Sequence, residues 1–165
     1  MALKYPPAVG SILVCEFPPC FSPPEMVKTR PVVVLSPKIT GRPDLATVVP
    51  LSTTAPSQIE SHHCKVPARM LPKSLQATAG DRWAKCDMVY TLHVSRLSPV
   101  KGKRDRVTGK RDYEHAKVDL ATLQELRRCA AAGLGIGVDL WPQAANSATQ
   151  TIDPEGETGD DRSAA

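Results

Sequence analysis

The chain has 165 residues, enough for one domain with a hydrophobic core, and 41% of its residues are hydrophobic. The whole chain carries +4 and its last fifteen residues carry −4, so residues 1–150 carry +8. A basic body favours RNA or DNA as partner over a membrane surface, although a merely well-solvated surface is about as frequent on charge alone.

The ends of the chain and its cysteines indicate where the protein resides. Residues 1–7 are too short and too rich in proline for a signal peptide, and no apolar run approaches membrane-spanning length, so we expect no membrane partner. Five cysteines are an odd number, which favours free thiols in a reducing cytoplasm. The acidic end predicts a disordered tail at 138–165 behind a domain at 1–137.

Short β-branched runs separated by prolines and glycines predict a protein rich in strands. We expect strands at 10–17, 30–36, 46–51, 62–67 and 81–94, with loops at 18–29 and 37–44. Pro50 should interrupt the third strand near its end. The very basic stretch 101–113 has a Thr108-Gly109 centre, which predicts a flexible hairpin or an open loop.

One helix is predicted near the C-terminus. Asp119 is the expected N-cap and Gly133 the expected end. Apolar residues follow at helical spacing: Leu120, Leu123, Leu126 and Ala130. Short strands followed by one helix predict a mainly β fold, a small antiparallel barrel capped by a C-terminal helix.

Polar residues border two of the predicted strands. Arg30 stands immediately before one apolar run, and Ser52, Thr53 and Thr54 stand immediately after another. If the two runs are neighbouring strands, a permanent cation, a carboxylate and several hydroxyls could meet at one place, which suits a site that holds and cleaves a phosphodiester. The structural alternatives are an arginine paired with a nearby acid and hydroxyls that serve as ordinary turn residues.

Four sequence blocks occur in an order and spacing that resemble one family. They are GSILVCEF at 10–17, KTRPVVVLS at 28–36, VVPLSTT at 48–54 and DMVYTLHVSRL at 87–97. They resemble the G-D-I, K-x-R-P-V-V-V-L-S, V-V-P-L-T-T and D-Q-I-R-T-V-D-x-S-R-L blocks of PemK/MazF-type toxins of bacterial type II toxin–antitoxin systems. The resemblance implies a dimeric SH3-like (CcdB/PemK-like) barrel. It also implies a metal-independent endoribonuclease of single-stranded RNA, including mRNA, that a cognate antitoxin neutralises.

The resemblance assigns catalytic roles to Arg30 and Ser52, with Glu25 as the loop acid used by some members. Arg30 suits the stabilisation of charge on the phosphoryl oxygens, Glu25 suits acceptance of the 2′-hydroxyl proton, and Thr53 can position the phosphate beside Ser52. A histidine is the alternative general base. Candidate RNA-binding residues are Lys28, Thr54, Tyr90, Lys101, Lys103, Arg104, Arg106, Lys110 and Arg111.

The chain departs from the family pattern at the Ser11, Pro23-Pro24 and Tyr90 positions, the last of which replaces an arginine. A non-catalytic inhibitor or nucleic-acid-binding module on the same fold, for example one directed at gyrase, therefore stays an alternative. A further alternative is a regulatory domain whose acidic tail covers its own basic face. The spacing around Cys64 matches no standard zinc motif, so we expect neither metal nor cofactor.

Overall fold

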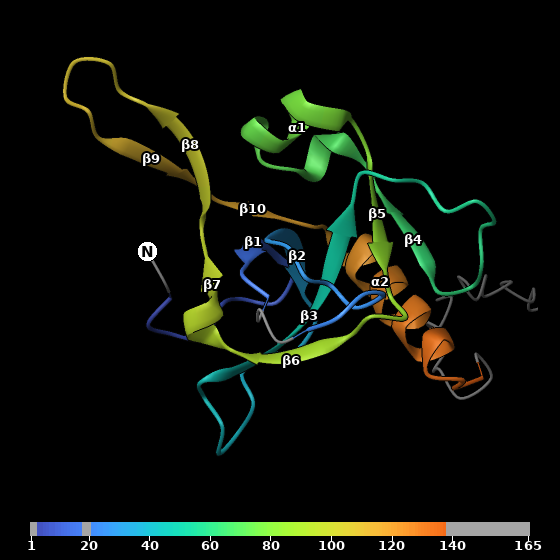
Figure 1. The fold of residues 1–165 in the computed structure, drawn as a ribbon. Helices are drawn as coiled ribbons and strands as arrows, with labels where there is room; N and C mark the ends of the chain where they lie inside the picture. The colour runs from blue at the N-terminus through green and yellow to red at the C-terminus, as the bar shows by residue number, and fades with distance from the viewer. Residues whose placement is uncertain (1–2, 18–20, 138–165) are drawn as a thin grey trace, which may run out of the picture.

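In the computed structural model, which describes residues 3–17 and 21–137, a curled antiparallel sheet carries a helix, α2, on one of its faces (Figure 1). The strands are β1 Ser11–Cys15, β2 Arg30–Val34, β3 Leu45–Ser52, β4 His63–Val66, β5 Arg82–Lys85, β6 Tyr90–His93, β7 Leu97–Ser98, β8 Val100–Arg104, β9 Arg111–Glu114 and β10 Ala116–Lys117. The helices are α1 Lys73–Ala79 and α2 Leu120–Gly133, with single 3-10 turns at Ala68–Met70 and Val94–Arg96.

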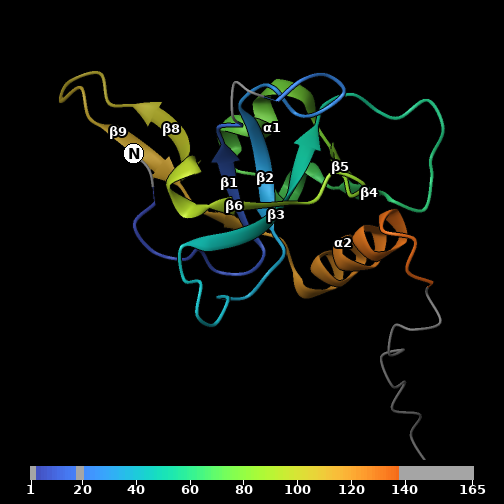
Figure 2. The same ribbon diagram turned by 60° about the horizontal axis from the view of Figure 1, so that its bottom comes forward.

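The main sheet runs in the order β10-β1-β2-β3-β5-β4, with β6 paired to the start of β3 and β7 paired to the end of β1. Every strand pair is antiparallel, and β8 and β9 form a separate hairpin that projects from the body (Figures 1 and 2). The predicted mainly β fold with a C-terminal helix is confirmed, and so is the hairpin in the basic stretch.

Most predicted strands are confirmed in place, but Pro50 does not interrupt β3. This strand changes partner along one of its edges, from β6 opposite residues 45–48 to β5 opposite Leu51 and Ser52. Pro50 lies between the residues of β3 that pair with β6 and those that pair with β5. On the other edge of β3, Pro50 pairs with Val32 of β2. A proline therefore fits there because no ladder bond on the first edge requires its missing N–H.

The single strand expected at 81–94 is wrong, because this segment forms two strands, β5 and β6. If the pairing of β3 with β5 continued along β3, Val48 would pair with Asp87. It pairs with Tyr90 of β6 instead. Three extra residues therefore bulge out between the two strands. Gly133 at the end of α2 packs on this bulge, where an added Cβ would lie 3.0 Å from the Cα of Asp87, so the close approach requires a glycine.

The predicted helix is confirmed at both ends. The Thr122 N–H donates to Oδ1 of the Asp119 side chain at 2.8 Å, which satisfies one of the free donors of the first turn. Leu123, Leu126 and Ala130 are buried as their spacing predicts, but Leu120 in the first turn is 68% exposed. The Arg127 guanidinium donates to the Leu35 carbonyl at 2.7 Å through Nη2, which ties the helix to the end of β2.

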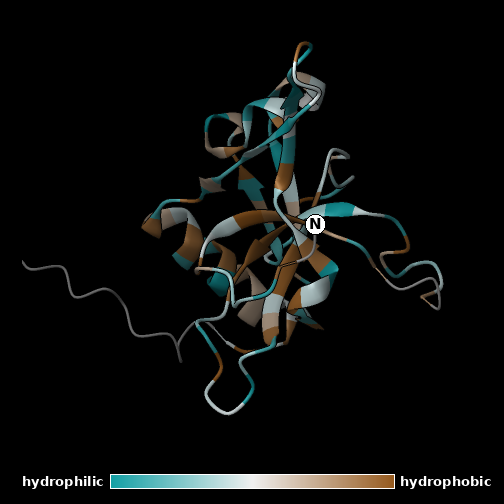
Figure 3. Ribbon diagram, turned by 90° about the vertical axis from the view of Figure 1, so that its left-hand side faces the viewer, coloured by the Kyte–Doolittle hydropathy of each residue, from teal (hydrophilic) through white to brown (hydrophobic). Residues whose placement is uncertain are grey.

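Two cores flank the sheet. The helix-side core lies between the sheet and α2 and contains Ile12, Val33, Val49, Leu51, Cys64, Cys86, Leu126 and Cys129 among others. The loop-side core lies on the other face and contains Leu13, Cys15, Phe17, Val32, Val34, Val48, Leu92 and Leu97 among others. Figure 3 shows the hydrophobic segments gathered in the central strands. The two cores follow the alternation of side chains along each strand.

Two remaining features concern α1 and the limits of the described chain. The helix α1 was not expected from the sequence; it begins after Pro72 and has no side-chain N-cap. No helix within residues 3–17 and 21–137 is long and apolar enough to cross a membrane. The predicted acidic tail at 138–165 and Cys20 lie outside the described residues.

Candidate functional site

The strand register brings Arg30 and Ser52 to the same end of the sheet. Arg30 begins β2, where it pairs with Cys15 of β1. Val32 pairs with Pro50 of β3, so the same register continued by two residues sets Arg30 opposite Ser52. Residues directly opposite one another in antiparallel strands have side chains on the same face, with Cβ atoms about 5 Å apart. The guanidinium and the hydroxyl thus leave the sheet side by side.

This shared face is the one that carries the loop-side core. Arg30 has the same alternation as Val32 and Val34, whose side chains are fully buried in that core. Arg30 and Ser52 are half-buried and extend the same rows past the end of the apolar cluster. The site is therefore a polar rim on a hydrophobic face, which combines partial desolvation with access from solvent.

The hydroxyl residues after β3 form a local turn. The Thr54 N–H donates to the Ser52 Oγ at 3.1 Å, the usual structural role of a serine at such a position. This bond uses Ser52 as an acceptor, so its own O–H is available to donate to a ligand. Thr53 and Thr54 are exposed beside it.

Glu25 lies on the exposed loop between β1 and β2, but its carboxylate is used within that loop. The Ser22 N–H donates to Glu25 Oε2 at 2.9 Å, and the Glu25 N–H donates to the Ser22 carbonyl at 2.9 Å. Within the described part of the chain, no hydrogen bond or ion pair joins Glu25 to Arg30. The carboxylate of Glu25, which we expected beside Arg30, therefore makes no direct contact with it.

A cleft of about 630 Å³ connects the start of β2 with the base of the hairpin. It is lined by Thr29, the neighbour of Arg30, and by Lys101, the first cation of the basic stretch. Glu16, Arg96 and Ser98 contribute further polar groups. Val14 also lines it and alternates along β1 with Leu13 and Cys15 of the loop-side core, so the cleft opens on the face of the sheet opposite to Arg30.

The six predicted basic residues of the hairpin are all exposed. Its turn is organised by Asp105, whose Oδ1 accepts the Val107 and Thr108 N–H groups at 2.7 and 2.8 Å. These bonds stabilise the carboxylate and lower the pKa of Asp105. Arg104 donates from Nε to the Gly109 carbonyl at 2.8 Å, so part of its guanidinium supports the turn.

The histidines lie apart from Arg30 and Ser52. His93 pairs with Leu45 at the opposite end of β3 from Ser52, which places it about 20 Å along the strand. His63 lies on the edge strand β4, and its Nδ1 accepts the Glu60 N–H at 3.0 Å. Burial, followed by the neighbouring imidazole, lowers its pKa. Neither histidine has a contact with the candidate site.

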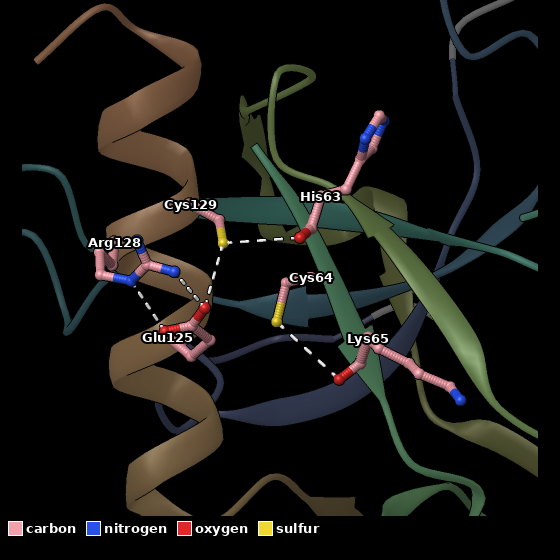
Figure 4. A network of polar contacts seen from close by, with 6 residues as sticks. All are labelled: His63, Cys64, Lys65, Glu125, Arg128 and Cys129. Atoms are coloured by element: carbon pink, nitrogen blue, oxygen red, sulfur yellow. Dashed lines mark hydrogen bonds and ion pairs between the residues drawn. The ribbon is translucent and has the colours of Figure 1, made fainter. Parts of the chain in front are cut away.

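Three cysteines gather in the helix-side core, at Cys64, Cys86 and Cys129. Cys129 Sγ lies 3.8 Å from the His63 carbonyl and 3.6 Å from Glu125 Oε1 (Figure 4). The contact with the neighbouring Cys129 thiol, followed by burial, raises the pKa of Cys64 and of Cys86, and the Cys64 Sγ donates to the Lys65 carbonyl at 3.9 Å.

The arrangement around these thiols does not make a metal centre. Among the described residues, no group of three or more histidine, cysteine, aspartate or glutamate side chains is placed to hold a metal ion. The thiols are buried between strands and helix, where they pack as small apolar groups.

Two residues beside the candidate site, Trp83 and Arg82, were not predicted from the sequence. Trp83 pairs with Ser52 on one side and with Lys65 on the other, so it continues the row of Arg30 and Ser52 across the sheet. Arg82 is only 3% exposed and donates from Nη2 to the Leu75 carbonyl at 2.9 Å, which ties β5 to α1. No local sequence signal marks either residue, because their places follow from the pairing of β5 with β3 and β4.

Comparison with known proteins identifies one family. The family model of PemK-like, MazF-like toxins of type II toxin–antitoxin systems matches residues 8–128. The protein YifN of Escherichia coli (strain K12) is 34% identical in an alignment 121 positions long, which covers 63% of this chain and 80% of YifN. The segment that the family model matches contains all ten strands and the first nine residues of α2.

Solved structures show the same fold at low sequence identity. MazF from Deinococcus radiodurans has a TM-score of 0.53 at 21% identity, covering 80% of this chain and 99% of that one. A MazE–MazF structure from the same organism has a TM-score of 0.51 at 20% identity, covering 81% and 100%. An endoribonuclease from a mycobacterial species has a TM-score of 0.50 at 19% identity, covering 82% and 95%.

Proposed function

The chain belongs to the PemK-like, MazF-like toxins of type II toxin–antitoxin systems, and from this membership we propose that it is an endoribonuclease of single-stranded RNA, including mRNA. The observation that carries the proposal is the pairing of Val32 with Pro50, because this register, continued by two residues, would set Arg30 opposite Ser52 at one end of the loop-side face. A similar structure that is named an endoribonuclease adds support at the level of the fold.

The chemistry uses the RNA's own nucleophile. The 2′-hydroxyl oxygen attacks the adjacent phosphorus, the bond to the 5′ oxygen breaks, and the products end in a 2′,3′-cyclic phosphate and a 5′-hydroxyl. The 2′-hydroxyl proton passes to a base, and the departing 5′ oxygen takes a proton from an acid. Negative charge develops on the non-bridging oxygens, so the reaction requires a fixed cation beside them.

Arg30 supplies that cation in our proposal. Its planar guanidinium stays charged and can donate to two phosphate oxygens at once. Ser52 donates its O–H to the same phosphate, because its Oγ already accepts the Thr54 N–H and is held in place by it. Thr53 adds a second hydroxyl at the exposed rim. This set stabilises the transition state without a metal ion.

Glu25 is the candidate base. To act, its carboxylate must exchange the Ser22 N–H for the 2′-hydroxyl of RNA, since Oε2 is engaged within the loop. A bound phosphate at Arg30 would bring the ribose toward this loop. A histidine from outside the site remains the alternative base only if RNA or a second subunit brings it near, because His93 lies at the far end of β3.

In this proposal the RNA strand passes from the site around the start of β2, enters the cleft on the opposite face at Thr29 and follows it toward the hairpin. Lys28 and Thr54 flank the scissile phosphate, and the cleft leads from Thr29 to Lys101. The remaining exposed cations of the hairpin then contact successive phosphates: Lys103, Arg104, Arg106, Lys110 and Arg111. Such contacts add affinity that depends on salt and carries little sequence information.

We also propose a homodimer and a protein antitoxin as partners. The antitoxin proposal is supported by a structurally similar MazF found in a MazE–MazF structure. A toxin that degrades RNA acts in the cytoplasm, where its substrate and its antitoxin are made. Sedimentation of the purified protein and co-purification with the product of an adjacent gene test these two partners separately.

One experiment tests the central proposal. The purified protein is incubated with a long RNA in EDTA, and new 5′ ends are mapped and tested for a free hydroxyl. We expect discrete cuts with 5′-hydroxyl ends and cyclic phosphates. An Arg30→Ala preparation made in parallel excludes a contaminating nuclease. RNA that is bound but uncut under all conditions would instead favour the non-catalytic binder.

A further inference from the structure

Tyr90 stands at the point where the loop between β1 and β2 meets the sheet. It begins β6 and pairs with Val48 of β3, so its side chain lies on the loop-side face. In Figure 2, β6 crosses this face of the molecule. The loop itself carries Glu25 and Lys28 and leads directly into Arg30, so its position decides where these groups lie.

Three parts of the loop and its entrance contact this one side chain. The Met26 N–H donates to the Tyr90 hydroxyl at 3.3 Å. The Phe21 ring stacks on the Tyr90 ring, with centroids 5.7 Å apart and planes at 25°. Phe17, at the end of β1, meets it edge-on at 5.0 Å and 62°. Each aromatic geometry is among the favoured ones.

These contacts hold both ends of the turn that carries Glu25. Phe21 precedes the turn and Met26 follows it, and the turn is closed by the two hydrogen bonds between Ser22 and Glu25. The turn is otherwise exposed, so Tyr90 provides a large share of what fixes it to the body. An arginine at position 90, as the family pattern has, could not accept the Met26 N–H, because a guanidinium only donates.

We propose that Tyr90 is a positioning residue that holds the Glu25 loop in the RNA-competent arrangement, and that it acts through the loop and not by contact with the phosphate. The inference rests on the proposed function for its effect on RNA. The anchoring itself is a property of the free protein and is tested without RNA.

The first test measures hydrogen exchange in the free protein. Tyr90→Phe removes only the acceptor, so the Met26 amide should exchange about fivefold faster. Tyr90→Leu also removes the ring contacts and should speed exchange across residues 21–26 by at least about twentyfold. Amides of β2 and β3 should keep their rates in both variants. Tyr5→Phe is the matched control, since Tyr5 is 78% exposed, and it should change nothing.

The second test separates positioning from direct contact by kinetics on a short RNA. A loosened loop must be ordered again when RNA binds, so Tyr90→Leu should raise KM about tenfold and leave kcat within about twofold. Tyr90→Phe should show the same pattern with a smaller rise. A direct phosphate contact would instead lower kcat, because that contact strengthens in the transition state.

Two results would overturn the proposal. The first is unchanged exchange of residues 21–26 in both Tyr90 variants, which would mean that the loop is held by other contacts. The second is a fall in kcat with KM unchanged, which would make Tyr90 a phosphate contact. If the wild-type protein cuts no RNA at all, the proposed function fails, while the exchange result still decides the anchoring role.

Discussion

The two faces of the sheet differ in what covers them. The helix-side core is closed by α2, which is fastened by Arg127 and contributes Leu126 and Cys129 to a dense aliphatic and thiol cluster. The loop-side core is closed by β6 and by a proline-rich loop that rests on a few aromatic contacts. The polar row of Arg30 and Ser52 emerges only on the second face. The first face therefore serves stability, and we propose that the second serves chemistry.

The sharpest test of this division is Arg30→Ala. Loss of a fixed cation at the phosphate should lower kcat/KM by about a thousandfold. The melting temperature should stay within about 2 °C, because no hydrogen bond or ion pair joins this guanidinium to the described residues. Activity is measured on a fluorogenic RNA and stability by thermal unfolding.

Arg42→Ala is the matched control for that change. Arg42 is exposed in the turn before β3, at the end of this strand opposite to Ser52, and its loss should affect neither quantity. Full cleavage by Arg30→Ala would remove this residue from the mechanism. A large fall in its melting temperature would show that the loop-side rim also carries stability.

The converse change is Leu126→Ala on the helix-side face. Leu126 is fully buried, so its truncation should lower the free energy of unfolding by about 3 kcal/mol. Leu120→Ala on the same helix should cost far less, because Leu120 is 68% exposed. Both are measured by denaturant titration. Activity per folded molecule should stay near wild type in each, and equal losses of stability in the two variants would contradict the packing described.

A third test asks whether the chemistry of the loop-side rim extends to the hairpin. Arg106→Ala combined with Lys110→Ala removes two phosphate contacts, so the slope of log affinity against log salt should fall by about 1.4 for single-stranded RNA. The pair Lys38→Ala and Arg42→Ala removes the same charges from an exposed turn and should leave the slope unchanged. Equal slopes in the two double variants would exclude the hairpin from the RNA path.

The smallest expected effect concerns the helix that closes the first face. The Thr122 N–H bound to its side chain lowers the pKa of Asp119 below its ordinary value. A depressed folded pKa contributes stability above the unfolded pKa, near 4, and that contribution is lost as the pH falls through the folded value. Asp119→Ala should thus lower the melting temperature slightly at pH 7 and not at pH 2.

Local patterns predicted much of the fold. The N-cap Asp119, the helix end at Gly133 and the spacing of Leu123 and Leu126 are local signals, and all are confirmed. The strand expected at 81–94 failed because its break depends on pairing with two ends of β3, which no local pattern reveals. The helix α1 was missed because it lacks a capping side chain and has only seven residues, about two turns.

The candidate site, too, was predictable from the sequence only in part. The residue types at Arg30 and Ser52 follow from the sequence blocks, and their meeting follows from the register of β2 and β3, which the alternation of buried valines makes predictable. The position of Glu25 did not follow, because its carboxylate satisfies a backbone donor in its own turn. Tyr90 was expected to face RNA, and the structure shows its ring stacked on Phe21.

By itself the sequence determined which residues carry charge and hydroxyls, which runs form strands and where the last helix begins and ends, because each of these depends on neighbours in the chain. Only the tertiary structure decided which face those polar groups share, which aromatic side chain holds the loop and where the cleft runs to the hairpin. These depend on pairing between distant segments, where closure of the whole sheet outweighs any local preference.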